Sequence, residues 1–63
     1  MKVNSSKLEM AKAKACMRTK EIIAAGIAKG TYNNIRAEKN VKASTVGKLA
    51  KILDCDVTDI LAD

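Results

Sequence analysis

The chain has 63 residues and a net charge of +5, from 12 Lys and Arg against 7 Asp and Glu, which predicts a single small basic domain over residues 1–63. One aromatic residue, no Pro and three Gly favour helices with short connections over a multi-stranded sheet. The absence of His excludes a Cys/His zinc site and a Ser-His or Cys-His catalytic pair. We therefore expect no enzyme, metal site or cofactor.

The two cysteines and the apolar runs indicate the compartment. Cys16 and Cys55 lie far apart in helix-like stretches, so we interpret them as small buried hydrophobic residues rather than as a redox pair or a disulfide framework. The longest apolar run, residues 22–28, is far shorter than the ~20 residues that span a membrane. These features predict a cytoplasmic protein that binds neither a membrane nor a small-molecule substrate.

The first helix is expected to begin at Ser6, because Ser6 and Glu9 have the spacing of a capping box. Apolar residues then recur at helical spacing and form a narrow stripe that ends near residues 16–17. The residues of this stripe are Leu8, Ala11 and Ala15.

Two short helices are expected next, over residues 19–25 and 29–37. Gly26 follows the first of them, where a helix end often requires a positive φ that Gly adopts without penalty. Tyr32 and Ile35 are predicted to face the core from the second helix. Polar and basic residues are left on its open side.

A fourth helix is expected to begin at Ser44 or Thr45, and its apolar residues have the clearest helical periodicity in the chain. They are Val46, Leu49, Ala50 and Leu53. Gly47 lies inside this helix at a cost of roughly 1 kcal/mol relative to Ala, which indicates a neighbouring backbone or ligand close to it.

A last short helix is predicted to be capped by Asp56 together with Asp59. Its residues Val57, Ile60 and Leu61 are expected to pack inward.

Charge is unevenly distributed along the chain. Residues 12–51 carry ten Lys and Arg against Glu21 and Glu38, whereas four of the seven acids, including Asp63, fall in the last ten residues. This asymmetry suggests a polyanionic partner. The alternative is that the lysines only keep an Ala-rich helical protein soluble.

Two short helices that meet at a turn Gly, the second with exposed small polar and basic groups, meet the requirements for entering the DNA major groove. The stretches KEIIAAGIAKGTYNNI (20–35), STVGKLAKIL (44–53) and DVTDIL (56–61) resemble the phage-repressor-like helix-turn-helix family, the Cro and lambda-repressor class. The resemblance covers about residues 8–61. It implies an all-α, compact, five-helix lambda-repressor-like bundle with the helix-turn-helix in its second and third helices.

The resemblance also implies which residues contact double-stranded DNA. Base contacts are expected at the start of the third helix, from Lys29, Gly30, Thr31, Asn33 and Asn34. Phosphate contacts are expected from the start of the second helix and from the loop and helix that follow the third, at Arg18, Thr19, Lys20, Lys39, Asn40, Lys42, Ser44 and Thr45.

The chemistry of these side chains suits the implied roles. An Asn amide can both donate to and accept from adenine, and the Thr31 methyl can contact a thymine methyl, so an A·T-containing half-site is expected. Lysines suit phosphates, which set affinity and register without reporting sequence. Asn33 and Asn34 can alternatively be ordinary solvated residues, and Gly30 can serve packing as well as close approach to the duplex.

The leading hypothesis is a sequence-specific DNA-binding transcriptional regulator of the small phage or mobile-element repressor type. The alternative is a protein-interaction module, antirepressor-like or antitoxin-like, that keeps the fold and binds DNA weakly. We expect a monomer or a weak homodimer that pairs on DNA, with half-sites about 34 to 36 Å apart.

Overall fold

The computed structural model describes residues 1–62 and contains, in that range, four α-helices and one 3₁₀ turn. The helices are α1 (Ser5–Ala15), α2 (Thr19–Ala24), α3 (Lys29–Arg36) and α4 (Ala43–Ile52), and the turn is η1 (Val57–Asp59). The predicted all-α class is confirmed. The predicted count of five helices is wrong, because the last element is a single 3₁₀ turn of three residues. None of the helices within residues 1–62 is long and apolar enough to cross a membrane.

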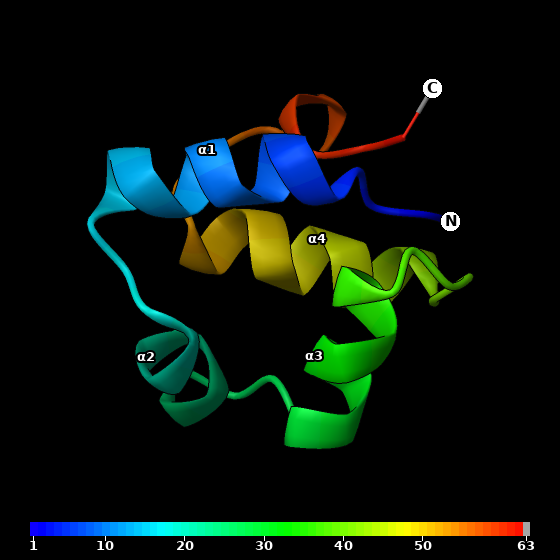
Figure 1. Cartoon of the computed structure of the whole chain (residues 1–63), viewed down its shortest axis with the longest axis horizontal. Coiled ribbons are helices and arrows are strands. Elements are labelled where there is room, and N and C mark those ends of the chain that lie inside the picture. Colours follow the sequence, from blue (N-terminus) through cyan, green and yellow to red (C-terminus); the bar gives the residue numbers. More distant parts are fainter. Residues whose placement is uncertain (63) are drawn as a thin grey trace.

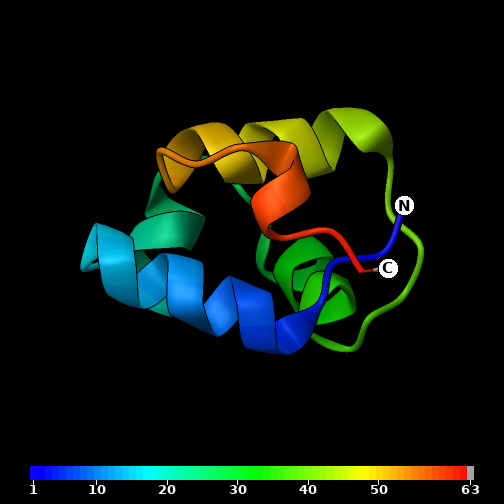
Figure 2. The same cartoon turned by 90° about the horizontal axis from the view of Figure 1, so that it is seen from above.

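The helices form two groups on opposite sides of the core (Figure 1). α1 and α4 run side by side in the same direction, and η1 lies between them when the molecule is turned (Figure 2). α2 and α3 lie on the side away from η1, with the first turn of α3 at the lower edge of Figure 1. The α2–turn–α3 unit therefore has one face free of the rest of the fold.

The core is entirely apolar apart from the hydroxyl group of Tyr32. Every helix contributes at least one residue to it, and the predicted inward positions of the third and fourth helices are confirmed. Val3, which lies before the first helix, is also fully buried and was not predicted. The buried residues are Val3, Leu8, Ala11, Ile22, Ile27, Tyr32, Ile35, Val46, Leu49, Ala50, Leu53 and Ile60.

Two predicted helix starts are wrong. α1 begins at Ser5 because Asn4 is its cap: the Asn4 Oδ1 atom accepts a hydrogen bond from the Lys7 N–H at 2.9 Å. The expected capping box at Ser6 is therefore not formed. α4 begins at Ala43, before Ser44, and its N-terminus has no side-chain cap.

All four helices end in the same way. A residue with a positive φ follows one position after the end of α1 and two positions after the ends of α2, α3 and α4. In each case the next residue donates its N–H to the carbonyl oxygen five positions earlier, at 3.0 to 3.4 Å. This is the Schellman motif, which satisfies carbonyl groups that a helix end leaves unpaired. The residues with positive φ are Cys16 (54°), Gly26 (125°), Glu38 (59°) and Asp54 (53°). The sequence predicted only the one at Gly26.

The expectation of two buried cysteines in helices is wrong. Cys16 is exposed in the left-handed position after α1, and Cys55 is half-buried just after α4. Both are free thiols. Burial, followed by the carboxylates of Asp59, Asp56 and Asp54, raises the pKa of the Cys55 thiol.

The N-terminal segment ties distant parts of the chain together. Val3 forms an isolated antiparallel bridge with Leu61, and the Asn4 N–H donates to the Ile60 carbonyl at 2.8 Å. The Val41 N–H donates to the Met1 carbonyl at 2.7 Å. Residues 1–4 therefore link the loop between α3 and α4 to the last part of the described chain.

Candidate nucleic-acid interface

The turn between α2 and α3 determines the orientation of α3 at the surface. Gly26 has a φ of 125°, which lets the chain reverse directly after α2. Ile22 before the turn and Ile27 after it are both buried. Two buried anchors on either side of a tight turn fix the angle between the helices and hold α3 as a rigid element at the surface.

α3 buries one face and exposes the other. Tyr32 is 1% exposed and Ile35 is 0% exposed, so helical periodicity places Asn33 and Asn34 on the solvent side together with the first two residues of the helix. Of the five predicted base-contacting residues, Lys29, Gly30, Asn33 and Asn34 are exposed and Thr31 is half-buried. The diameter of an α-helix with its side chains, ~10–12 Å, matches the ~12 Å width of a major groove.

Gly30 has no packing role among residues 1–62, since no heavy atom other than those of its neighbours and of its own helix backbone lies within 4 Å of the place where a Cβ atom would stand. The same is true of Gly47 in α4, so the expected neighbouring backbone beside Gly47 is not found within this chain. Both glycines leave open space at the surface.

Thr19, at the start of α2, uses its side chain inside the molecule. The Thr19 hydroxyl accepts a hydrogen bond from the Lys12 ammonium at 3.2 Å and donates one to the Tyr32 hydroxyl at 3.4 Å. Its neighbours Arg18 and Lys20 are exposed. The two cations at this end of α2 thus face solvent, while Thr19 connects α1, α2 and α3.

Lys12 also belongs to this region, although no pattern in the sequence predicts a role for it there. Only 11% of its side chain is exposed, and its ammonium lies 5.6 Å from the centre of the Tyr32 ring and 3.5 Å from the Glu9 carboxylate. Burial lowers the pKa of Lys12, but the hydrogen bond and charge of Tyr32, together with Glu9, outweigh burial and raise it overall. In the sequence, the structural role of Lys12 is indicated only by its position directly after Ala11, which is buried on α1.

The loop between α3 and α4 presents three predicted phosphate-contacting residues, Lys39, Asn40 and Lys42, all exposed. Glu38 and Val41 fix this loop. The Glu38 carboxylate accepts hydrogen bonds from Ser5, and Val41 pairs with the backbone of Met1. The loop is therefore held at two points by the N-terminal segment.

Two further predicted phosphate-contacting residues lie in the first turn of α4. Ser44 is exposed and Thr45 is half-buried. Ala43 alone separates them from the loop, so these two polar residues stand close in the chain to Lys39, Asn40 and Lys42.

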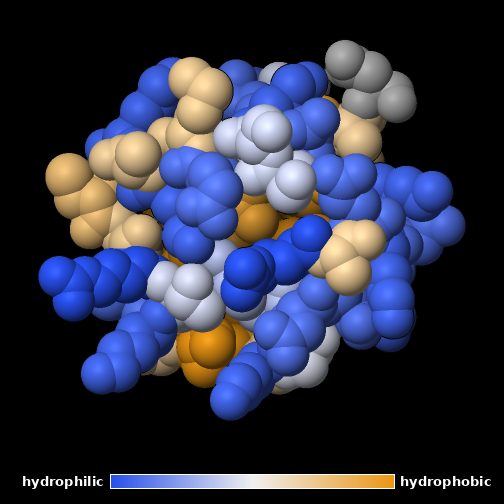
Figure 3. Space-filling model, viewed as in Figure 1, coloured by the Kyte–Doolittle hydropathy of each residue, from blue (hydrophilic) through white to orange (hydrophobic). Residues whose placement is uncertain are grey.

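Cations dominate this side of the molecule. Between residues 18 and 53 the chain has only two acids, and each has a local structural role. The Glu21 carboxylate accepts a hydrogen bond from the Arg18 N–H at 3.0 Å, and Glu38 is bonded to Ser5. Figure 3 shows long hydrophilic side chains projecting from the lower edge of the molecule, where α2 and α3 lie. The exposed cations in this stretch are Arg18, Lys20, Lys29, Arg36, Lys39, Lys42, Lys48 and Lys51.

Lys48 is a second residue of this region for which the sequence predicts no contact with DNA. Its ammonium lies 3.0 Å from the position that a Cβ atom on Gly26 would occupy. The side chain therefore runs from α4 onto the turn between α2 and α3. Sequence periodicity places Lys48 outside the buried stripe of α4, but it does not show that the side chain reaches this turn.

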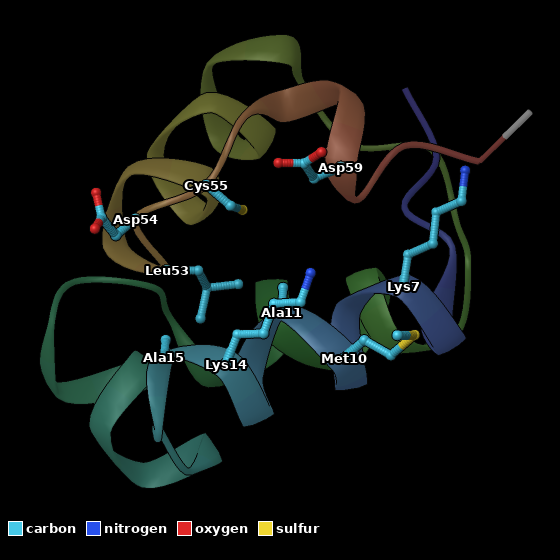
Figure 4. Close-up of a pocket in the computed structure, with 9 residues that line it drawn as sticks. All are labelled: Lys7, Met10, Ala11, Lys14, Ala15, Leu53, Asp54, Cys55 and Asp59. Carbon is cyan, nitrogen blue, oxygen red and sulfur yellow. The ribbon is translucent and has the colours of Figure 1, made fainter.

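A groove of about 260 Å³ lies on the other side of the molecule, between α1 and the segment that follows α4 (Figure 4). Among residues 1–62 no three His, Cys, Asp or Glu side chains are placed to hold a metal ion. The residues that line the groove lie on α1, just after α4 and on η1, and α1 and η1 lie at the edge of the molecule opposite the first turn of α3 (Figure 1).

Comparison with known proteins gives one match. The family model of the Cro/C1-type HTH DNA-binding domain matches residues 2–63. No curated protein and no solved structure matches the chain. The matched range includes α2, the Gly26 turn, α3 and the basic loop that follows.

Proposed function

The chain belongs to the Cro/C1-type HTH DNA-binding family, and on this premise we propose that it is a sequence-specific, double-stranded-DNA-binding transcriptional regulator. We place it with the small repressors of phages and mobile elements, as a non-enzymatic protein of the cytoplasm. The observation that carries the proposal is the outward face of α3: four exposed polar or small residues on a rigid helix, beside a surface on which both acids are locally bonded.

In this proposal α3 enters the major groove. Asn33 and Asn34 are suited to paired donor and acceptor contacts with adenine, worth roughly 1 to 3 kcal/mol of discrimination for each good pair. Gly30 lets the backbone come close to the base edges because its surroundings are open. Thr31 is half-buried, and its methyl group is proposed to contact a thymine methyl.

The remaining predicted residues hold the sugar–phosphate backbone on both sides of α3. Arg18 and Lys20 are proposed to contact one strand, and Lys39 and Lys42 with Asn40, Ser44 and Thr45 the other. Thr19 is proposed to contribute its backbone N–H, since its hydroxyl is bonded to Lys12 and Tyr32. These contacts set affinity and orientation without reading sequence.

Two copies are proposed to pair on a palindromic site. α3 of each copy would then occupy one half-site, and the half-site centres would be about 34 to 36 Å apart. The described molecule extends 24 × 21 × 18 Å, so two copies can lie next to each other at that spacing on one side of a duplex.

Selection from a random double-stranded library tests this function directly. An enriched A·T-containing half-site is expected, and titration of the selected duplex against salt should give a log–log slope of about −0.9 for each phosphate contacted. Weak binding that is indifferent to sequence, together with stoichiometric binding to another protein, would instead support the interaction-module alternative.

A further inference from the structure

We propose that the groove between α1 and the segment after α4 is a self-association surface that takes a second copy of this chain, back to back with the first. The inference goes beyond DNA binding, because it concerns α1 and η1, which line the groove and lie at the edge of the molecule opposite the first turn of α3 (Figure 1). It rests on the shape of the groove, on one exposed apolar side chain and on the arrangement of opposite charges.

The groove has an apolar floor and an apolar rim. Ala11, Ala15 and Leu53 line it from α1 and from the end of α4 (Figure 4). Met10 stands at its edge with 63% of its surface exposed, and the other large hydrophobic residue that is exposed among residues 1–62, Met1, is 44% exposed. A flexible thioether side chain beside an open groove is suited to fill the same groove on another molecule.

The two walls of the groove carry opposite charges. Lys14 on α1 points into the groove, and Asp59 points into it from the opposite wall, with Asp54 nearby (Figure 4). The described ion pairs within 4 Å do not include one between Lys14 and either aspartate. Each wall therefore offers a charge that an outside partner can pair with.

This arrangement favours a second copy over an unrelated partner. An occupant must present an acid towards α1 and a base towards Asp59. A two-fold axis through the groove does this, because it brings Lys14 of each copy to Asp59 of the other and places each Met10 over the opposing groove. Such an isologous contact is self-complementary and closes as a dimer.

The contact area limits the strength of this association. A standard interface buries about 800 Å² on each partner, which is about a fifth of the 4089 Å² surface of this chain. One groove and its rim offer less than that. We therefore expect weak association, with a dissociation constant in the range of about 10 µM to 1 mM.

The pairing has a consequence for DNA that rests on the proposed function. Since the groove lies opposite the α2–α3 side, a back-to-back pair presents its two α3 helices in opposite directions. Such a pair cannot occupy two half-sites on one side of one duplex. It would instead connect two separate duplex segments.

The test measures self-association without DNA, so its result is independent of whether α3 reads bases. Sedimentation equilibrium over about 0.05 to 2 mM protein should show the mass rising from 6.8 kDa towards twice that value. Amide NMR shifts should change with concentration at Met10, Lys14, Cys55 and Asp59, and not at residues 29–36.

Variants identify the contacts. Met10→Lys should raise the dissociation constant at least about tenfold, whereas Ala13→Lys, which adds the same charge at an exposed position of α1 that does not line the groove, should have little effect. Lys14→Glu and Asp59→Lys should each weaken association. The double variant should restore it to within about threefold of the original, because the exchanged charges still pair across the axis.

Asp59→Asn controls for the local role of Asp59, whose carboxylate accepts a hydrogen bond from the Asp56 N–H at 3.0 Å. The amide keeps an acceptor there but removes the charge, so it should weaken association without changing the circular dichroism spectrum. A mass of 6.8 kDa at every concentration, shift changes centred on α3, or no recovery in the double variant would overturn the proposal.

Discussion

The Glu38 carboxylate accepts two hydrogen bonds from Ser5, one from the backbone N–H at 3.2 Å and one from the hydroxyl at 2.9 Å. This contact joins the loop just after α3 to the first residue of α1. Glu38 is an acid in a loop whose other charged residues are cations, so electrostatics alone disfavours it next to phosphates. Its bonds to Ser5 give a structural reason for its presence.

We predict that Glu38→Gln lowers the melting temperature at neutral pH, because charge-assisted hydrogen bonds become neutral ones. The hydrogen bonds from the Ser5 backbone and then from its hydroxyl lower the pKa of Glu38. A lowered folded-state pKa means that the unfolded chain binds the proton more readily. The stabilisation is therefore complete above the ordinary Glu value of about 4.3 and is lost as the pH falls through the folded-state value.

Melting curves at pH 7 and at about pH 3 check this prediction, since the difference between Glu38→Gln and the parent should shrink at the lower pH. Asp54→Asn is the matched control: it also removes one carboxylate at a residue with positive φ, a conformation that Asn tolerates. A Glu38→Gln protein that melts like the parent at pH 7 would show that the contact does not stabilise the fold.

Lys12 provides a test at alkaline pH. Its pKa is raised above 10.5 in the folded protein, so the folded state holds this proton more tightly than the unfolded chain does. The stabilisation is present below the ordinary value and is lost as the pH rises through the folded-state value. We predict that Lys12→Met melts below the parent at pH 8 and that the difference shrinks as the pH rises above 10.5. Lys14→Met, at an exposed site on the same helix, is the control. Its difference in melting temperature from the parent should not change comparably over this pH range.

The sequence was sufficient to predict the helices but not most of their ends. Hydrophobic periodicity identified α3 and α4 because the buried residues of each recur at helical spacing. The helix ends at Cys16, Glu38 and Asp54 could not be predicted in this way. They use a left-handed conformation that favours Gly, and these three side chains adopt it because the Schellman hydrogen bonds compensate locally.

The candidate site could likewise be predicted from the sequence only in part. Burial of Tyr32 and Ile35 follows from their spacing, and it determines which residues of α3 are exposed. The inward hydrogen bonds of Thr19 and the reach of Lys48 to the turn depend on contacts between different helices. Local patterns carry no information about such contacts.

Asn33→Ala and Lys42→Ala should separate base reading from phosphate binding. Both residues are exposed, so neither change should disturb the fold. Asn33→Ala should lose roughly 1 to 3 kcal/mol of discrimination at one base pair and keep much of the nonspecific affinity. Lys42→Ala should weaken all duplexes alike and reduce the salt slope by about one unit. Titrations with the selected site, a single-base variant and an unrelated duplex at several salt concentrations measure the discrimination and the salt slope. Equal effects of the two substitutions on every duplex would refute the division of roles.

Two glycines should respond to Ala in opposite directions. Gly47 lies inside α4 with no heavy atom within 4 Å of an added Cβ, so Gly47→Ala should stabilise the fold by about 1 kcal/mol, or roughly 4 to 8 °C in melting temperature. Gly26 has a φ of 125°, and an added Cβ would stand 3.0 Å from the Lys48 ammonium. Gly26→Ala should therefore destabilise the protein. Thermal denaturation of both variants decides this, and a destabilised Gly47→Ala protein would mean that α4 does not have the described surroundings.

Leu49 is the most direct test of the core. It is fully buried in α4, so Leu49→Ala should cost roughly 2 to 5 kcal/mol through lost burial and the cavity that remains. Stability scales at about 0.05 to 0.15 kcal/mol per residue, so a loss of this size can unfold so small a domain.

Chemical denaturation followed by circular dichroism measures the change in Leu49→Ala. Leu49→Met keeps the volume and should cost less than about 1.5 kcal/mol, and Met10→Ala, which truncates an exposed side chain on α1, should be within about 0.5 kcal/mol of the parent. These controls separate loss of packing from a general intolerance of substitution. An unchanged denaturation midpoint in Leu49→Ala would remove α4 from the centre of the core, and the position of the α2–α3 unit against α4 would then lose its physical basis.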